Sequence, residues 1–159
     1  VLNLFCYTGS FSVYAAAGGA KEVVSIDLSN TYLNWAKENF ELNGFVDWNK
    51  YSFIKADVLQ YLDKLPLNHF DLVILDPPTF SNSKMMKDIL DIQQDHVELI
   101  NKLLLSVKSD GKIYFSTNSR KFIIDDKNMI AKEIKDITRA TTPFDFEGKL
   151  NRYCFKILK

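Results

Sequence analysis

The amino-acid sequence predicts one α/β domain over residues 1–159, with a seven-stranded, mostly parallel β-sheet, helices on both faces and an antiparallel pair of strands at the C-terminal edge. Two observations support this prediction. Short apolar runs typical of buried strands alternate with helix-like segments as far as Ser116, a rhythm that favours a parallel sheet. Near the C-terminus two strand-like segments follow one another without a helix between them, and such strands can pair antiparallel.

Each strand is predicted where β-branched and aromatic residues run together between turn signals. The parallel strands are expected at residues 1–6, 22–27, 51–56, 70–75 and 112–116, and the antiparallel pair at residues 136–142 and 152–158, joined by residues 143–150.

The helices are predicted from apolar residues at helical spacing and from the turn residues that end each run. A first helix is expected at residues 11–17, stopped by Gly18 and Gly19, and a second at residues 30–42, stopped by Asn43-Gly44. The longest is expected at residues 87–107, with Asp110-Gly111 turning into the next strand, and the last at residues 125–135.

Composition narrows the class of protein. Hydrophobic residues make up 47% of the chain and charged residues 25%, which is typical of a globular domain. No apolar run approaches a membrane span and no signal peptide is evident, so we expect a cytoplasmic protein. Cys6 and Cys154 lack metal-ligand spacing and are expected to be reduced, with no metal bound. Because the chain begins directly in a strand, we expect a fragment of a longer polypeptide.

Charge also constrains the partners. The 20 basic and 20 acidic residues cancel, which argues against a domain that grips nucleic acid unaided. Any contact with nucleic acid is therefore expected to be local or assisted by further domains.

In open parallel sheets, ligands bind beyond the carboxyl ends of the strands. The first such end is Tyr7-Thr8-Gly9-Ser10, where one glycine lets the turn tighten and the backbone approach a ligand. A plain strand-to-helix turn explains it equally well. The G-x-G-x-x-G fingerprint is absent, so the turn lacks the glycines that let a backbone bind a pyrophosphate.

Two acids follow the second and third strands. Asp27 can accept hydrogen bonds from both ribose hydroxyls of a nucleoside-bearing ligand. Asp57 can hold an adenine amine, although either acid alone also suits a helix N-cap. Together with the missing fingerprint, they favour adenosine without a pyrophosphate.

The fourth strand ends in Asp76-Pro77-Pro78-Thr79-Phe80. Two prolines fix an extended backbone and remove two amide donors, which leaves carbonyls free to accept and an aromatic ring over the pocket. A structural turn rarely requires this combination after a buried strand.

Together these motifs resemble the class I methyltransferases that modify ribosomal RNA bases, and the resemblance spans the whole chain. More narrowly, the extension from Asp76 through Met85, with Phe115-Ser116-x-Asn118, resembles the 7-methylguanosine-forming half of the bifunctional 23S rRNA guanine methyltransferases. The resemblance implies a Rossmann-like fold and S-adenosylmethionine as cofactor.

The resemblance also implies site residues. It would make Asp76, Pro77, Pro78 and Phe80 catalytic, with Phe80, Lys84, Asn118 and Arg120 facing the substrate. It would make the cofactor shell from Phe5, Tyr7, Thr8, Gly9, Ser10, Asp27, Leu28, Ser29, Asp57 and Val58.

The expected reaction is methyl transfer to N7 of a guanine in 23S rRNA. Residues 116–119 contain no cysteine, which argues against covalent addition to cytosine. Guanine N7 carries a lone pair and no proton, so alignment matters more than a general base. N7 faces the deep, narrow major groove of RNA helices, so the substrate is expected to be unfolded or locally opened.

Three alternatives stay open. One is methylation of an exocyclic amine such as guanine N2, whose proton Asp76 or a nearby carbonyl would accept. Another is a non-catalytic, cofactor-binding module of a larger enzyme. A nicotinamide-dependent oxidoreductase is disfavoured by the missing glycines.

Overall fold

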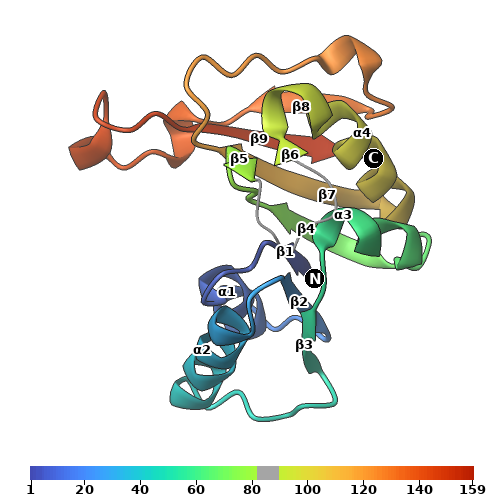
Figure 1. Cartoon of the computed structure of the whole chain (residues 1–159), viewed down its shortest axis with the longest axis vertical. Helices are drawn as coiled ribbons and strands as arrows, with labels where there is room; N and C mark the ends of the chain where they lie inside the picture. The colour runs from blue at the N-terminus through green and yellow to red at the C-terminus, as the bar shows by residue number, and fades with distance from the viewer. Residues whose placement is uncertain (82–89) are drawn as a thin grey trace.

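The computed structural model describes residues 1–81 and 90–159 and contains the predicted seven-stranded sheet (Figure 1). The strand order is β3-β2-β1-β4-β7-β9-β8, parallel from β3 to β7 and antiparallel for β9 and β8. The strands are β1 (Leu2–Leu4), β2 (Val23–Asp27), β3 (Tyr51–Lys55), β4 (Phe70–Leu75), β7 (Val107–Thr117), β8 (Glu133–Asp136) and β9 (Tyr153–Leu158).

Helices cover both faces of the sheet, as predicted. The larger core lies where α3 (Val58–Tyr61) and α4 (Ile92–Ser106) pack, and it joins Leu4, Val73 and Leu103, all fully buried. The smaller core contains Ala16 from α1 (Ser10–Ala17), Val23 from β2 and Phe40 from α2 (Asn30–Leu42). Because successive strand residues alternate between faces, Leu2 and Leu4 enter the larger core while Asn3 turns toward α1.

The first two helices lie where the sequence predicts them. Helix α1 spans Ser10–Ala17 and helix α2 spans Asn30–Leu42. Ser29 caps α2, since its hydroxyl accepts a hydrogen bond from the amide of Tyr32. The apolar face of α2 buries Leu33, Ala36 and Phe40.

The predicted helix at residues 125–135 is wrong, because this segment forms the 3-10 turn η2 (Asp126–Asn128) followed by β8. Pairing with β9 places Ile134 opposite Ile157. Ile130, which the helix prediction would bury, is 63% exposed. Tertiary pairing with β9 therefore overrides the local periodicity.

The predicted strand at residues 136–142 is also wrong. Strand β8 ends at Asp136, and residues 139–141 form the 3-10 turn η3 (Arg139–Thr141). The hydroxyl of Thr141 donates to the carbonyl of Ile137 at 2.8 Å, and that of Thr142 donates to Thr138 at 2.7 Å. These local bonds compete with a strand ladder, so the β-branched composition misled the prediction.

The longest helix is shorter than predicted. Residues 87–89 lie outside the described part of the chain, and β6 (Leu90–Asp91) pairs with β5 (Phe80–Ser81). The carboxylate of Asp91 caps α4, accepting from the amide of Gln93 at 3.0 Å. The helix begins at Ile92 for this reason.

Asp110-Gly111 is not a turn, because β7 runs through both residues. A Cβ atom at Gly111 would lie 2.6 Å from Val107 Cγ1 and 3.0 Å from the carbonyl oxygen of Phe70. The β4–β7 register shifts at this point, between Phe70 and Leu72. Glycine thus permits a close approach inside a strand.

Within residues 1–81 and 90–159, no helix is long and apolar enough to span a membrane, and no cluster of His, Cys, Asp or Glu could hold a metal ion. Cys6 and Cys154 are both free and buried, which confirms the prediction of reduced thiols.

Candidate functional site

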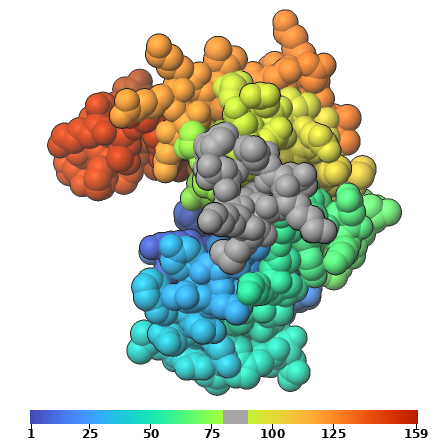
Figure 2. Space-filling model, in the orientation of Figure 1, coloured from blue at the N-terminus to red at the C-terminus, as the bar shows by residue number. Residues whose placement is uncertain are grey.

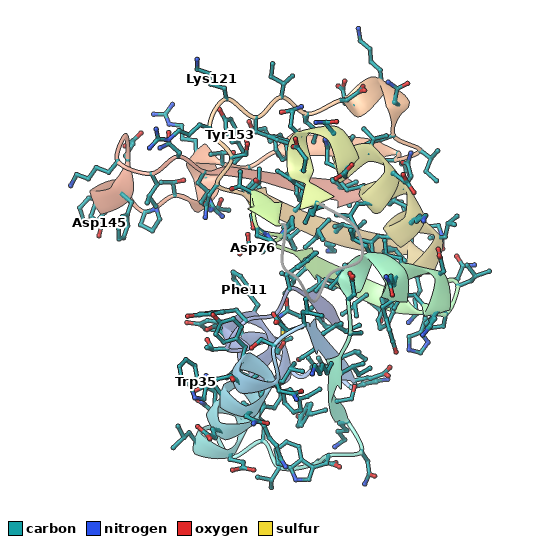
Figure 3. The ribbon with its side chains drawn as sticks, viewed as in Figure 1. Phe11, Trp35, Asp76, Lys121, Asp145 and Tyr153 are labelled. Carbon is teal, nitrogen blue, oxygen red and sulfur yellow. The ribbon has the colours of Figure 1, made fainter. Side chains whose placement is uncertain are left out.

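The candidate site lies at the edge where the central parallel strands end. Register aligns Leu4 with Leu75 and Leu75 with Phe115, so the residues that follow β1, β4 and β7 meet at one edge of the sheet. Figure 3 shows Phe11 and Asp76 on this side of the molecule. The polar strand ends identified from the sequence are therefore brought together, as ligand sites in open sheets require.

The loop after β1 has a strained backbone. Phe5 and Tyr7 adopt positive φ angles of 54° and 50°, a region that non-glycine residues rarely enter. The amide of Cys6 donates to the carbonyl of Ile26 at 3.0 Å, and the amide of Gly9 donates to the carbonyl of Cys6 at 2.8 Å. Strain held by such bonds is common at ligand-binding sites.

Asp27 connects this loop to the residue that caps α2. Its Oδ2 accepts from the amide of Tyr7 at 2.9 Å, and its Oδ1 accepts from the amide of Ser29 at 2.9 Å. A carboxylate offers about four acceptor sites, so these bonds orient Asp27 without using its full capacity. The carboxylate is partly exposed, and its remaining acceptor sites suit the hydroxyl donors of a ribose.

Gly9 has a packing role that the sequence did not reveal. It N-caps α1 with φ of 75°, and a Cβ atom there would lie 2.7 Å from the Cβ of Ala36 on α2. The side chain of Asn39 also donates to the carbonyl of Thr8 at 2.9 Å. Helix α2 therefore packs against the loop after β1 and supports its backbone.

Beneath this loop, three buried polar side chains connect α1 to the sheet. Asn3 Nδ2 and Ser25 Oγ each lie 2.8 Å from Ser12 Oγ. All three residues are at most 1% exposed. A satisfied buried network of this kind fixes the direction in which α1 leaves the site.

Aromatic rings border the loop. Tyr7 is 54% exposed and packs edge-to-face on Tyr32, with ring centroids 4.5 Å apart. Tyr32 lies 6.2 Å from Trp35, which is 48% exposed rather than in the core. The site residues expected from the sequence did not include Tyr32 or Trp35, although their three-residue spacing on α2 is a usable signal.

Asp57 and Val58 stand at the start of α3. Asp57 Oδ1 caps the helix by accepting from the amide of Leu59 at 3.1 Å, the structural role that the sequence left open. Val58 is 2% exposed and belongs to the core. A cofactor contact at Val58 would therefore have to use its backbone. Leu28 and Ser29 are half-buried, while Ser10 is exposed.

Asp76 projects from the end of β4. Its Oδ1 accepts a 2.6 Å hydrogen bond from the hydroxyl of Ser116 on β7. Pro77 is buried and Pro78 exposed, so the motif enters the fold on one side and faces solvent on the other. Lys84 lies outside the described residues, as does the side chain of Phe80, whose backbone belongs to β5.

The predicted substrate residues Asn118 and Arg120 are exposed just after β7. Arg152, which was not among the residues expected from the sequence, reaches the same edge because β9 runs antiparallel to β7 and begins where β7 ends. Cys154 pairs with Ser116 across these strands. An antiparallel partner could not be placed until the strand order was known.

Neither cysteine offers a thiolate. Burial, reinforced by the negative charge of Asp27, raises the pKa of Cys6 to about 12. Burial also raises the pKa of Cys154. Both thiols stay protonated at neutral pH, which disfavours a nucleophilic role for them.

His96 has a structural role. It is 2% exposed, and its Nδ1 donates to the carbonyls of Ile92 and Gln93, both at 3.0 Å. Its Nε2 accepts from the amide of Asp125 at 3.0 Å. These bonds specify a neutral ring that joins α4 to the segment after β7.

Comparison with known proteins agrees with this geometry. A family model described as S-adenosylmethionine-dependent methyltransferase matches residues 1–148. The chain is 51% identical over 158 residues to the ribosomal RNA large subunit methyltransferase K of Neisseria meningitidis, covering 98% of this chain and 44% of that protein. It is 50% identical over 149 residues to the methyltransferase K/L of Shewanella loihica, covering 92% and 21% respectively.

Solved structures share the fold. SMU.776, crystallised with SAH, aligns with a TM-score of 0.78 and 26% identity, over 99% of this chain and 44% of that one. The SAM-dependent methyltransferase from Agrobacterium tumefaciens aligns with a TM-score of 0.64 and 25% identity, over 76% and 38%. The chain thus spans less than half the length of these relatives.

Proposed function

The chain belongs to the S-adenosylmethionine-dependent methyltransferases, and from this premise we propose that it methylates N7 of a guanine in 23S rRNA within a longer polypeptide. The two relatives described above are both named as methyltransferases of the large-subunit ribosomal RNA. Such a substrate implies action in the cytoplasm. The resemblance of the segment after Asp76 to 7-methylguanosine-forming enzymes supports N7 as the acceptor.

S-adenosylmethionine, when bound, supplies a methyl group activated by a sulfonium. The residues around the loop after β1 would hold it. Asp27 would accept hydrogen bonds from the ribose hydroxyls, with Tyr7 and Tyr32 beside the same loop. Asp57, which follows β3, would contact the adenine.

The observation that carries the proposal is the Asp76-Pro77-Pro78 segment at the end of β4, with its carboxylate held by Ser116. Prolines lack amide donors, so this segment offers acceptors to the edge of a base. Guanine N7 needs no proton removed, so positioning by these acceptors is sufficient for its methylation. Neither cysteine competes as a nucleophile, since burial raises both pKa values.

Methylation of guanine N2 is the second candidate. The acceptor amine would lose a proton as it is methylated, and the partly free carboxylate of Asp76 could accept it. Nucleoside analysis of RNA methylated by the protein distinguishes the two candidates. We expect 7-methylguanosine, and N2-methylguanosine as the product would refute the N7 proposal.

Variants at the motif test the site itself. Asp76→Ala and Phe80→Ala should abolish most methyl transfer while the protein still folds and binds cofactor. A protein that binds S-adenosylmethionine but never methylates RNA would instead be a cofactor-binding module.

A further inference from the structure

We propose that the C-terminal lobe, residues 138–152, holds a single-stranded segment of RNA next to the nucleotide that is methylated. The inference rests on the proposed function, because it assumes an RNA substrate. The lobe leaves the sheet after β8 and returns to it at β9. Figure 2 shows it standing clear of the body, with a hollow between it and the N-terminal helices.

The lobe starts and ends close to Asp76. Strand β9 begins at Tyr153, and its next residue, Cys154, pairs with Ser116, which binds Asp76. Asp145 in the lobe and Asp76 lie on the same side of the molecule (Figure 3). A polynucleotide bound at Asp76 would therefore pass near the lobe.

A pocket of about 750 Å³ lies within the lobe. Basic, hydroxyl and apolar side chains line it together with two carboxylates: Arg139, Thr142, Phe146, Leu150 and Arg152, with Asp136 and Glu147. Its volume falls in the range of roughly 300–1,000 Å³ that suits small ligands, and a nucleotide is of this size. Cationic, hydroxyl and aromatic groups together match the phosphate, sugar and base of a nucleotide.

The arginines are available to a phosphate. The side chain of Arg139 is 95% exposed, and its only ion-pair partner among the described residues is Glu147, with Nε 3.8 Å from Oε1. An exposed pair at this distance is weak and can be exchanged for another anion. Arg152 donates from one terminal nitrogen to Thr141 Oγ1 at 2.9 Å, which orients a guanidinium that has five N–H donors.

The phenylalanines suit stacked bases. Phe144 is 91% exposed and Phe146 is 45% exposed. In the described parts of the chain, neither ring pairs with another aromatic ring. Exposed aromatic side chains beside arginines are the usual platform for unpaired bases in RNA-binding proteins.

The charge of the lobe is nearly balanced, with a small positive excess. The lobe has three basic residues, Arg139, Lys149 and Arg152, against two acidic ones, Asp145 and Glu147, in a chain of zero net charge. Because the whole chain has no net charge, this small excess of positive charge would attract only the RNA phosphates that lie next to the lobe.

Fluorescence anisotropy with a labelled single-stranded RNA oligonucleotide tests the inference. The double variant Phe144→Ser, Phe146→Ser should raise the apparent Kd about tenfold or more, the loss typical of a stacked base. Arg139→Gln should weaken binding and lower the slope of log K against log salt by about one. Leu42→Ser and Lys21→Gln, exposed at the far end of α2 and before β2, are the matched controls and should bind like the wild type.

Calorimetry with S-adenosylmethionine, combined with the RNA measurements, distinguishes a failure of the proposed function from a failure of the inference about the lobe. A wild-type protein that binds the cofactor but no RNA would overturn the proposed function and this inference together. Wild-type RNA affinity in the lobe variants, with RNA still methylated, would overturn this inference alone. If those variants bind RNA normally but convert a dimer to a monomer, the lobe is a self-association surface and the inference is wrong. Phe144→Ser keeps the test valid if the double variant fails to fold, since Phe144 is almost fully exposed.

Discussion

The hydroxyl of Ser116 donates a 2.6 Å hydrogen bond to the carboxylate of Asp76 and so joins the ends of β7 and β4. The bond fixes the side chain that begins the Asp-Pro-Pro motif. The second carboxylate oxygen, Oδ2, has no hydrogen-bond partner among the residues that the structure describes, and it could therefore contact a substrate. Because the two residues lie 40 positions apart, only the parallel pairing of their strands brings them together.

Ser116→Ala should lower kcat for methyl transfer about tenfold, because a bond of this kind contributes about 1–2 kcal/mol to orienting a charged partner. Cofactor affinity and the free energy of unfolding should stay close to wild type. Ser116→Thr should restore most activity, since it keeps the hydroxyl. Ser52→Ala, on the distant β3, serves as the control. Equal activity in both alanine variants would contradict a positioning role.

Gly9→Ala should destabilise the fold by about 2–4 kcal/mol, since the new methyl group adds strain at positive φ and a clash with Ala36. Urea denaturation measures the loss. Gly44→Ala is the matched control, because its φ is also positive, at 78°, but its surroundings are open. It should lose only about 1 kcal/mol. The double variant Gly9→Ala, Ala36→Gly should relieve the clash, and no recovery there would disprove the steric explanation.

Asp27→Asn should weaken S-adenosylmethionine binding about ten- to a hundredfold, measured by calorimetry. The amides of Tyr7 and Ser29 bond different carboxylate oxygens, and in asparagine one of these oxygens becomes an NH2 group, which cannot accept a hydrogen bond. The loop after β1 would therefore lose one of its supports as well as a charged partner for ribose. Asp47→Asn, on the exposed turn before β3, should bind normally. Unchanged affinity in Asp27→Asn would remove Asp27 from the cofactor site.

His96→Ala should reduce the free energy of unfolding by about 2–3 kcal/mol, because it removes a buried ring and its bonds to α4 and Asp125. At a temperature where the variant stays folded, kcat should be close to wild type. His69→Ala removes an exposed ring paired with Glu22 and should cost less than about 1 kcal/mol. Lost activity in a stable His96→Ala protein would point to catalysis instead.

Cys6 should make the protein less stable in alkali. Its thiol ionises with an ordinary pKa of 9.0 in the unfolded chain but about 12 in the folded one, where burial keeps it protonated. The unfolded state therefore releases a proton that the folded state keeps, so stability falls as pH rises from about 9 toward 12. Urea denaturation across this range should show a shallower decline in Cys6→Ala than in the wild type. Parallel curves would contradict the burial effect.

Thiol labelling gives an independent measurement of the same property. Both buried cysteines should react with a disulfide reagent at pH 8 far more slowly in the folded protein than in urea. Equal rates would show that the thiols are accessible.

The sequence alone determined the α/β class, the order of the parallel strands along the chain and the chemistry at their ends. These features depend on local patterns: apolar runs for strands, apolar residues at helical spacing for α2, and polar residues where each run stops. Asp27 and Asp76 could be identified because each follows a buried strand, and parallel strands place their ends at one edge.

Only the tertiary structure decided which residues complete the site. Ser116 and Arg152 reach Asp76 or its neighbourhood through strand pairing, which no local pattern encodes. The same reason explains the wrong helix at residues 125–135, because pairing with β9 stabilises β8 more than local periodicity stabilises a helix. Gly9 depends on both the sequence and the tertiary structure. The sequence predicted a tight turn at this residue, and the structure shows that Ala36 packs so close to it that no side chain fits there.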